Sequence, residues 1–488
     1  MTRSSTTPSI RFYEALMPII FLVLILSFNV LVVFGDEATS GPNQFALLLA
    51  GAVAAIIGFK HNISYETMLQ KVAKNIESTS GAILILLFVG ALTGTWLISG
   101  IIPTMVYYGL KLLNPTVFLA SSLIITALVS LIIGSSWSTT ATVGIALIGI
   151  GKALGFPPPM VAGAVISGAY FGDKMSPLSD TTNLASAVAG VDLYRHVRYM
   201  MYTTIPTISI ALIIFIILGL SHTGNDIHNT QALLADIKTS FFIHPALLIV
   251  PATVIFLIIK KTPPLVALLA GVLLGGLAAL FFQKNLLLNL LEPNQPYYTG
   301  AYKNIMKAVV WDFNIKTANP ILNELFSSGG MKGMLSTIWL IISAMFFGGI
   351  MEAIGALKKI SETLLAKFKG TFGLFASTDL SCIVFNATAS DQYLAIVVPG
   401  KMYKQAFDDA GLAPENLSRT LEDAGTVTSV LVPWNTGGAY NAKVLGVPTE
   451  SYVIYAVFNW LSPVMTLIFA YFKIKIKRRE NDELKKII

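Results

Sequence analysis

The stretch 172-GDKMSPLSDTTN-183 interrupts an apolar run that extends from about residue 158 to residue 191. Pro177 removes a backbone donor and clashes with the preceding turn of a helix. The residues around it carry two carboxylates, an amide and four hydroxyls. Inside a bilayer such groups are costly unless they line a cavity. The stretch therefore predicts a membrane helix broken at a functional site, with an exposed loop between two short helices as the alternative.

Composition places this break in a polytopic membrane protein. Of the 488 residues, 54% are hydrophobic and only 12% are charged, about half the charged share of a soluble domain. Apolar runs of spanning length recur to the end of the chain. They lie near 12–34, 43–59, 80–102, 115–133, 141–156, 158–191, 199–221, 242–259, 264–283, 333–357, 371–386, 391–411, 419–445 and 450–473. We therefore expect an all-α fold, with amphipathic interfacial or linking segments at 65–79 and 301–312.

Internal similarity predicts two repeats. Residues 47–53 (LLLAGAV) resemble residues 267–273 (ALLAGVL), 220 positions later. Ser138-Thr139-Thr140 falls against Ser390-Asp391-Gln392 at an offset of 252, and Pro177 falls against Pro433 at an offset of 256. The increasing offset predicts an insertion in the second half, at about 284–332.

Charges near the helix ends predict that the two repeats are inverted. Asp36 and Glu37 follow the first apolar run, whereas Lys260 and Lys261 follow its counterpart. Since cytoplasmic loops carry an excess of lysine and arginine, equivalent loops should lie on opposite sides. We expect a first repeat at 1–221, an extracytoplasmic linker at 222–241, a second repeat at 242–474, and a basic cytoplasmic tail at 475–488 suited to anionic lipid. Both termini would be cytoplasmic, in the cell membrane.

Two short polar segments predict the tips of helical hairpins. The first runs from Gly134 to Thr140 and contains Ser136, Ser138 and Thr139, and its counterpart runs from Asn386 to Asp391. Small hydroxyl side chains can satisfy freed backbone groups or coordinate a cation through oxygen. Inverted repeats with hairpins and discontinuous helices are typical of secondary transporters. A polar helical turn that faces other helices is the alternative.

The candidate site joins the polar residues of these breaks, because Na⁺ prefers oxygen ligands. The first half would contribute Asp173, Ser176, Ser179, Asp180, Thr181 and Asn183, and the second half Asn386, Ser390, Asp391, Asp423, Asn435 and Thr436. Exchange requires one carboxylate that holds either Na⁺ or H⁺. We expect it to be Asp173 or Asp180, which would hold Na⁺, before Asp391 or Asp423. An ion pair between Lys174 and Asp173 is the alternative that would make Asp173 structural.

The broken stretch also carries a family resemblance. Residues 172–185, together with Trp137-Ser138-Thr139-Thr140 and Pro433-Trp434-Asn435, resemble the pattern of the NhaC-type Na⁺/H⁺ antiporter family. The resemblance covers essentially the whole chain and implies Na⁺/H⁺ antiport. It also implies relatives that exchange organic acids such as malate and lactate, or that handle amino acids, and a hairpin-containing fold related to a broader group of ion transporters.

The main expectation is thus a secondary antiporter that exchanges Na⁺, and also Li⁺, for H⁺. Coupled exchange of a small organic acid or amino acid remains open, although an anion site favours arginine or lysine and Lys174 is the one obvious cation in the breaks. A passive cation channel is a remoter alternative. The chain has no GxxxxGK[ST] or HExxH motif and a single cysteine, Cys382. We therefore expect neither an enzyme, a cofactor, a disulfide nor a nucleic-acid partner, and analogy with related transporters suggests a homodimer.

Overall fold

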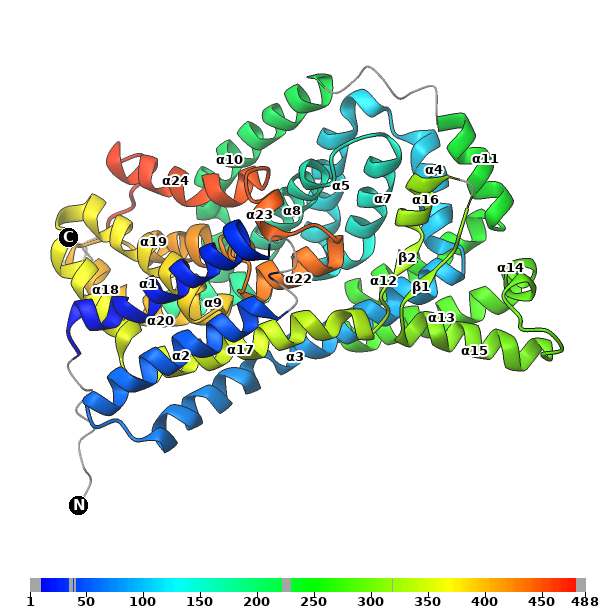
Figure 1. The fold of residues 1–488 in the computed structure, drawn as a ribbon. Helices are drawn as coiled ribbons and strands as arrows, with labels where there is room; N and C mark the ends of the chain where they lie inside the picture. The colour runs from blue at the N-terminus through cyan, green and yellow to red at the C-terminus, as the bar shows by residue number, and fades with distance from the viewer. Residues whose placement is uncertain (1–9, 35–37, 39–40, 222–229, 318, 480–488) are drawn as a thin grey trace.

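The computed structural model describes residues 10–34, 38, 41–221, 230–317 and 319–479 (Figure 1). Helices make up almost all of it, and the strands β1 (Phe313–Asn314) and β2 (Ser327–Ser328) form one short antiparallel ribbon. Parts of the predicted linker (222–229) and of the predicted basic tail (480–488) lie outside the described residues. The all-α fold expected from the sequence is confirmed.

The elements of the chain fall into two groups, before and after residues 222–229. The first half contains α1 (Phe12–Phe28), η1 (Asn29–Val33), α2 (Pro42–Lys60), α3 (Tyr65–Ile98), α4 (Ile101–Leu112), η3 (Pro115–Val117), α5 (Phe118–Ile133), α6 (Ser136–Thr139), η4 (Thr140–Gly144), α7 (Ile145–Ala153), α8 (Pro158–Met175), α9 (Asp180–Ala189) and α10 (Leu193–Ser221). The second half contains α11 (Thr230–Ser240), η6 (Pro245–Leu248), α12 (Ile249–Ile259), α13 (Pro264–Phe282), α14 (Lys284–Asn289), α15 (Tyr297–Val310), α16 (Pro320–Leu325), η7 (Lys332–Met334), α17 (Leu335–Ala353), α18 (Ala356–Lys367), α19 (Gly370–Thr388), α20 (Gln392–Asp409), α21 (Pro414–Thr420), η8 (Leu421–Thr426), η9 (Ser429–Leu431), α22 (Thr436–Leu445), α23 (Thr449–Tyr452) and α24 (Val457–Tyr471).

Several helices are long and apolar enough to cross a membrane. Among the described residues there are six, and a seventh if the pair Gln231–Ser240 and Pro245–Ile259, bent by 85°, is one span. The six are Pro42–Lys60, Tyr65–Ile98, Pro115–Ile133, Leu193–Ser221, Pro264–Phe282 and Lys332–Ala353. Fewer helices qualify than the fourteen apolar runs of the sequence, because many of those runs are divided at breaks. The protein is therefore a polytopic α-helical membrane protein with discontinuous helices.

Helix α3 corrects one sequence expectation, since residues 65–79 do not form a separate interfacial segment. They are the first turns of a single helix of 34 residues, whose N-cap Ser64 accepts a bond from the backbone nitrogen of Thr67. The hydroxyls of Ser78, Thr79 and Ser80 donate to carbonyls three or four residues earlier. These polar side chains are satisfied within the helix, so the polar stretch does not end it. The other amphipathic segment forms α15, which packs against α3.

Both predicted hairpins are present. Helix α5 is followed by Gly134, whose φ is +74°, and the chain returns as α6, η4 and α7. The arms run antiparallel, because Phe118 at the start of α5 contacts Phe156, which follows α7, with ring centroids 5.3 Å apart. Helices α19 and α20 form the second hairpin, in which Phe375 and Phe407 also lie 5.3 Å apart.

Residues in the left-handed conformation recur at a constant separation along the chain. Gly134, Gly155 and Gly190 adopt the left-handed conformation, and so do Ser390, Gly411 and Gly446 in the second half of the chain. The separation is 256 positions in each case. The expected pairing of Ser138 with Ser390 at an offset of 252 was wrong. It relied on similar side chains, whereas the turn is fixed by a backbone conformation that glycine adopts most readily.

The counterpart helices α3 and α17 lie side by side and run in opposite directions (Figure 1). Gly349 of α17 faces Val72 near the start of α3, whereas Met334, just before α17, faces Gly90 near its end. Each of these two helices also packs on a helix from the other half of the chain: α2 packs on α17, and α13 packs on α3.

Close packing of α5 on α8 positions the end of α8. A Cβ atom at Gly172 would lie 2.3 Å from the carbonyl oxygen of Ala127 and 2.6 Å from the backbone nitrogen of Leu131. We expect Gly172→Ala to lower the free energy of unfolding by about 1–3 kcal/mol, because backbone atoms must move. Thermal unfolding of the purified protein in detergent measures the change. The control is Gly81→Ala on α3, where the added Cβ would meet no atom within 4 Å. Equal midpoints for the two variants would contradict the expectation.

Candidate functional site

A cavity of about 570 Å³ lies where the first hairpin, the break after α8 and the start of α20 converge. Its lining includes eight of the residues singled out in the sequence: Ser138, Asp173, Ser179, Asp180, Thr181, Asn183, Asp391 and Thr436. The first half supplies most of them, and the second half contributes Asp391 and Thr436. We call this space the three-acid cavity, after Asp173, Asp180 and Asp391.

Asp173 lies in the last turn of α8 and is almost fully buried, with 7% of its surface exposed. Its Oδ2 accepts bonds from the backbone nitrogen of Ser136 at 3.0 Å and from the Ser136 hydroxyl at 2.7 Å. Ser136 is the first residue of α6, which Ser135 caps. The backbone donor at a helix start favours a carboxylate. Both of these bonds use Oδ2, and the carboxylate itself lines the cavity.

The other two acids of the cavity lie at helix starts. Asp180 begins α9 after the cap Ser179, and its exposed carboxylate accepts a bond of 3.0 Å from the hydroxyl of Tyr393. Asp391 caps α20 through a bond of 2.9 Å from the backbone nitrogen of Leu394. Tyr393 of α20 thus reaches across to α9. The contact joins the two halves at the edge of the cavity.

Asp423 does not line the three-acid cavity. It lies in the π-helical turn η8, fully buried, and forms an ion pair with Lys174. Its carboxylate also accepts bonds from Thr203 at 2.9 Å, from Ser462 at 3.2 Å and from Thr466. Lys174 therefore pairs with Asp423 rather than with Asp173. Adjacent residues on a helix point about 100° apart, so Asp173 and Lys174 reach different sides of α8.

The remaining predicted residues support the breaks. Asn435 caps α22 and donates to Asn386, whose amide donates to the carbonyl of Gly425 at 2.7 Å. The carbonyl of Ser390 accepts a hydrogen bond from the backbone nitrogen of Thr436 at 3.0 Å. The hydroxyl of Ser176 accepts one from the backbone nitrogen of Leu178 at 3.2 Å. These contacts satisfy backbone groups freed where the helices stop.

The predicted first hairpin tip, residues 134–140, contains both the turn and the start of the returning arm. The turn itself is Gly134-Ser135, whereas Ser136, Ser138 and Thr139 form the first turn of α6. Thr139 donates to the carbonyl of Ser135 at 2.9 Å. Of the three, Ser136 contacts Asp173 and Ser138 lines the cavity. The turn requires a residue in the left-handed region, which the hydroxyl pattern did not indicate.

Sequence reasoning missed two sets of residues. Trp137 and Tyr440 stack with ring centroids 4.3 Å apart and line the cavity, together with Gln392 and Tyr393. Asp379, Arg419 and Glu422 are fully buried near the Lys174–Asp423 pair. Within the part of the chain that the structure describes, their side chains have no hydrogen-bond partner. Asp379 could have been identified from the sequence, because it is an acid inside the apolar run 371–386.

The three-acid cavity is suited to a hard cation. The described residues include no group of three His, Cys, Asp or Glu side chains that could hold one metal ion. A cation bound here would therefore need hydroxyl and carbonyl oxygens in addition to carboxylates. Ser179 and Thr181 provide hydroxyls beside Asp173 and Asp180, and their oxygens lie 3.0 Å apart. Such a set of carboxylate and hydroxyl oxygens is typical of sites for hard cations.

Comparison with known proteins agrees with this chemistry. Residues 168–474 match the model of a family described as the Na⁺/H⁺ antiporter family. The chain is 34% identical to the Na⁺/H⁺ antiporter NhaC of Alkalihalophilus pseudofirmus, over 89% of this chain and 91% of the relative. It is 38% identical to the malate-2H⁺/Na⁺-lactate antiporter of Bacillus subtilis, over 93% and 92%. It is 35% identical to the arginine/ornithine antiporter ArcD of Halobacterium salinarum, over 97% and 94%.

Proposed function

The chain belongs to the Na⁺/H⁺ antiporter family and is a secondary antiporter, and we propose that Na⁺ and H⁺ compete for Asp173 in the three-acid cavity. The observation that carries this proposal is the position of Asp173. Its carboxylate is nearly buried, is held at the tip of a hairpin and still lines a cavity with two other acids.

Competition follows from the cost of an isolated charge in the membrane. A buried carboxylate is stable when it holds a proton or when it binds a cation, but costly when it does neither. Because one carboxylate cannot do both at once, binding of Na⁺ releases the proton. Asp180, Ser179 and Thr181 would complete the Na⁺ shell from the same break, with Asp391 and Thr436 from the other half. Li⁺, which is smaller and equally hard, would use the same ligands.

A second candidate function comes from the relatives. Their names include exchangers of malate and lactate and of arginine and ornithine, and a cavity of about 570 Å³ is large enough for a small organic molecule. The lining disfavours an organic anion, because it contains three carboxylates and the single cation Lys261. Arg419 is buried elsewhere and does not line the cavity. We therefore rank inorganic cation exchange first and exchange of organic acids or amino acids second.

The proposal includes the arrangement of the two halves. Antiparallel packing of α3 on α17, and the exchange of their neighbours α2 and α13, support two inverted repeats. The first would span 1–221 and the second 242–474, separated by the linker 222–241. Alternating access around a site shared by the halves then explains exchange better than a passive channel. A cell-membrane location with both termini cytoplasmic, contacts with membrane lipid and a homodimer complete the proposal.

Proton flux in sealed proteoliposomes tests the function. The full chain is reconstituted with an internal pH dye, a pH gradient is imposed, and NaCl, LiCl, KCl, sodium malate or sodium lactate is added. Proton movement on addition of NaCl or LiCl, and not of KCl, supports the proposal. A response only when malate or lactate is present would transfer the assignment to organic-acid exchange.

A further inference from the structure

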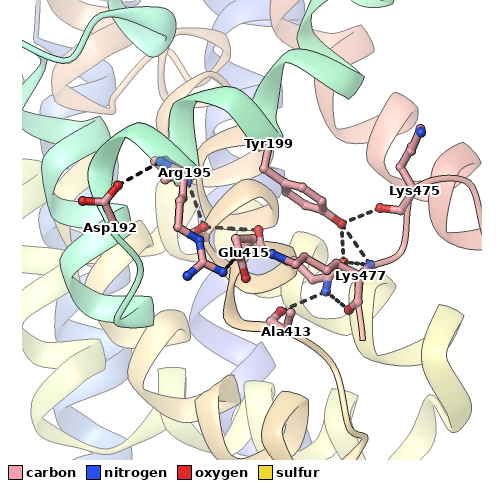
Figure 2. Close-up of polar contacts among 10 residues, drawn as sticks. Asp192, Arg195, Tyr199, Ala413, Glu415, Lys475 and Lys477 are labelled. Carbon is pink, nitrogen blue, oxygen red and sulfur yellow. Dashed lines mark hydrogen bonds and ion pairs between the residues drawn. The ribbon is translucent and has the colours of Figure 1, made fainter. Parts of the chain in front are cut away.

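A second cavity, of about 480 Å³, lies away from the three-acid cavity, between the start of α10, α21 and the segment that follows α24 (Figure 2). We call it the basic pocket. Its lining consists of Arg195, Arg198, Tyr199, Tyr202, Glu415, Lys475, Ile476 and Lys477. Four of these eight side chains are cations and one is an acid.

The single acid does not neutralise the basic pocket. Glu415 accepts hydrogen bonds from Arg195 at 2.6 Å and from Lys477 at 2.7 Å, so both of those cations already have an ion-pair partner (Figure 2). Arg198 and Lys475 make no ion pair with any acid among residues 10–34, 38, 41–221, 230–317 and 319–479, although the Lys475 ammonium lies 5.0 Å from the centre of the Tyr202 ring. The pocket therefore offers two positive charges to an anion.

The wall of the basic pocket is held in place by backbone contacts. Tyr199 donates to the carbonyl of Lys475, and the amide of Asn416 donates to the carbonyl of Lys477 at 2.6 Å. The backbone nitrogen of Ala413 donates to the same carbonyl of Lys477 at 3.0 Å. The segment 475–477 is thus fixed against α10 and α21. Because the backbone of this segment is already held in place, less conformational entropy is lost when a ligand binds beside it.

One face of α10 continues from the basic pocket as an apolar surface. Arg195, Arg198 and Tyr202 follow helical spacing, and the same face continues with Ile205 and Ile213, which are 46% and 56% exposed. These isoleucines lie in one of the helices apolar enough to cross the membrane. The cations therefore lie at the start of this face, and the apolar isoleucines lie further along it. Tyr202, a residue type enriched at membrane interfaces, lies between them.

We propose that the basic pocket binds the phosphate headgroup of an anionic phospholipid, whose acyl chains lie along the exposed face of α10. A free phosphate ion would account for the two cations that Glu415 leaves without an ion pair. It would not account for the apolar face that begins within two turns of them. Basic pockets beside membrane helices bind anionic headgroups for this combination of reasons.

Lipid titration of the intact protein tests this inference, independently of transport. The full chain is purified in a neutral detergent, and bound phosphatidylglycerol and phosphatidylcholine are counted by native mass spectrometry at increasing lipid concentration. We expect selective retention of phosphatidylglycerol. In the variant Arg198→Gln/Lys475→Gln its affinity should fall roughly 10- to 30-fold, with little change for phosphatidylcholine.

A matched control removes two charges elsewhere. Lys307→Gln/Lys316→Gln changes two exposed lysines in the insertion, where no loss of selective binding is expected. Equal binding by the wild type and the pocket variant, or an equal loss in the control, overturns the proposal. A third arm adds inorganic phosphate. Complete displacement of phosphatidylglycerol by inorganic phosphate at the same concentration would assign the basic pocket to a soluble anion and overturn the lipid assignment.

Discussion

Asp173→Asn reduces Na⁺-driven proton flux to the level of liposomes without protein, while the variant remains folded in the membrane. Asparagine keeps the size of the side chain and can still accept the bonds from Ser136 at 3.0 and 2.7 Å. It removes the one property that exchange needs, a group that is either protonated or charged. The loss should therefore exceed that of any substitution at the hydroxyl ligands.

Two further variants show whether the loss is specific to Asp173. Asp180→Asn should weaken the apparent Na⁺ affinity but retain exchange, because Asp180 is exposed and bonded to Tyr393. Glu324→Gln removes an exposed acid whose side chain is 73% accessible and should leave the flux unchanged. The measurement is the initial rate of pH change against Na⁺ concentration. Full activity in Asp173→Asn, with the loss instead in Asp180→Asn, would show that the shared carboxylate is Asp180.

The second large effect concerns stability, because Asp423→Asn leaves the ammonium of Lys174 buried without a counter-ion. Both side chains of this pair are fully buried. Removal of one member of such a pair costs about 3–5 kcal/mol of unfolding free energy. Lys174→Met should cost less, because Asp423 keeps its hydroxyl donors Thr203, Ser462 and Thr466.

Thermal unfolding in detergent measures both changes against two controls. The double variant Lys174→Met/Asp423→Leu removes both charges and should recover most of the lost stability. Lys152→Met breaks an exposed pair with Glu324, 2.7 Å long, and should cost at most about 1 kcal/mol. If Asp423→Asn unfolds at the wild-type midpoint, the pair is not a structural element and Asp423 returns to the list of transport residues.

Local chemistry explains which features the sequence predicted. Pro177 and its polar neighbours cannot continue a helix, so the break after α8 was predictable from Gly172–Asn183 alone. Asp173, Asp180 and Asp391 were also predictable, because an acid inside an apolar run needs a cavity or a partner. The candidate residues Asp423 and Asn435 of the second half lie at a break too, which contains the π-helical turn η8 and the short helix η9.

The failures have a common cause in contacts that are distant along the chain. Lys174 pairs with Asp423, 249 positions away, and no local pattern distinguishes that partner from Asp173. Tyr393 reaches Asp180 across 213 positions for the same reason. Residues 65–79 were misassigned because their hydroxyls bond within α3, so polarity did not mark the end of a helix.

The constant spacing between left-handed residues, from Gly134 to Gly190 in one half and from Ser390 to Gly446 in the other, has a practical consequence. If the halves are repeats as proposed, the lengths between these landmarks agree, whereas residues 284–332, which contain helices and the ribbon, have no equivalent in the first half. Length is therefore fixed around the three-acid cavity and free in that segment. A rigid fusion partner for electron microscopy, or an epitope for a binder, belongs in the exposed turn between α14 and α15, which does not line the three-acid cavity.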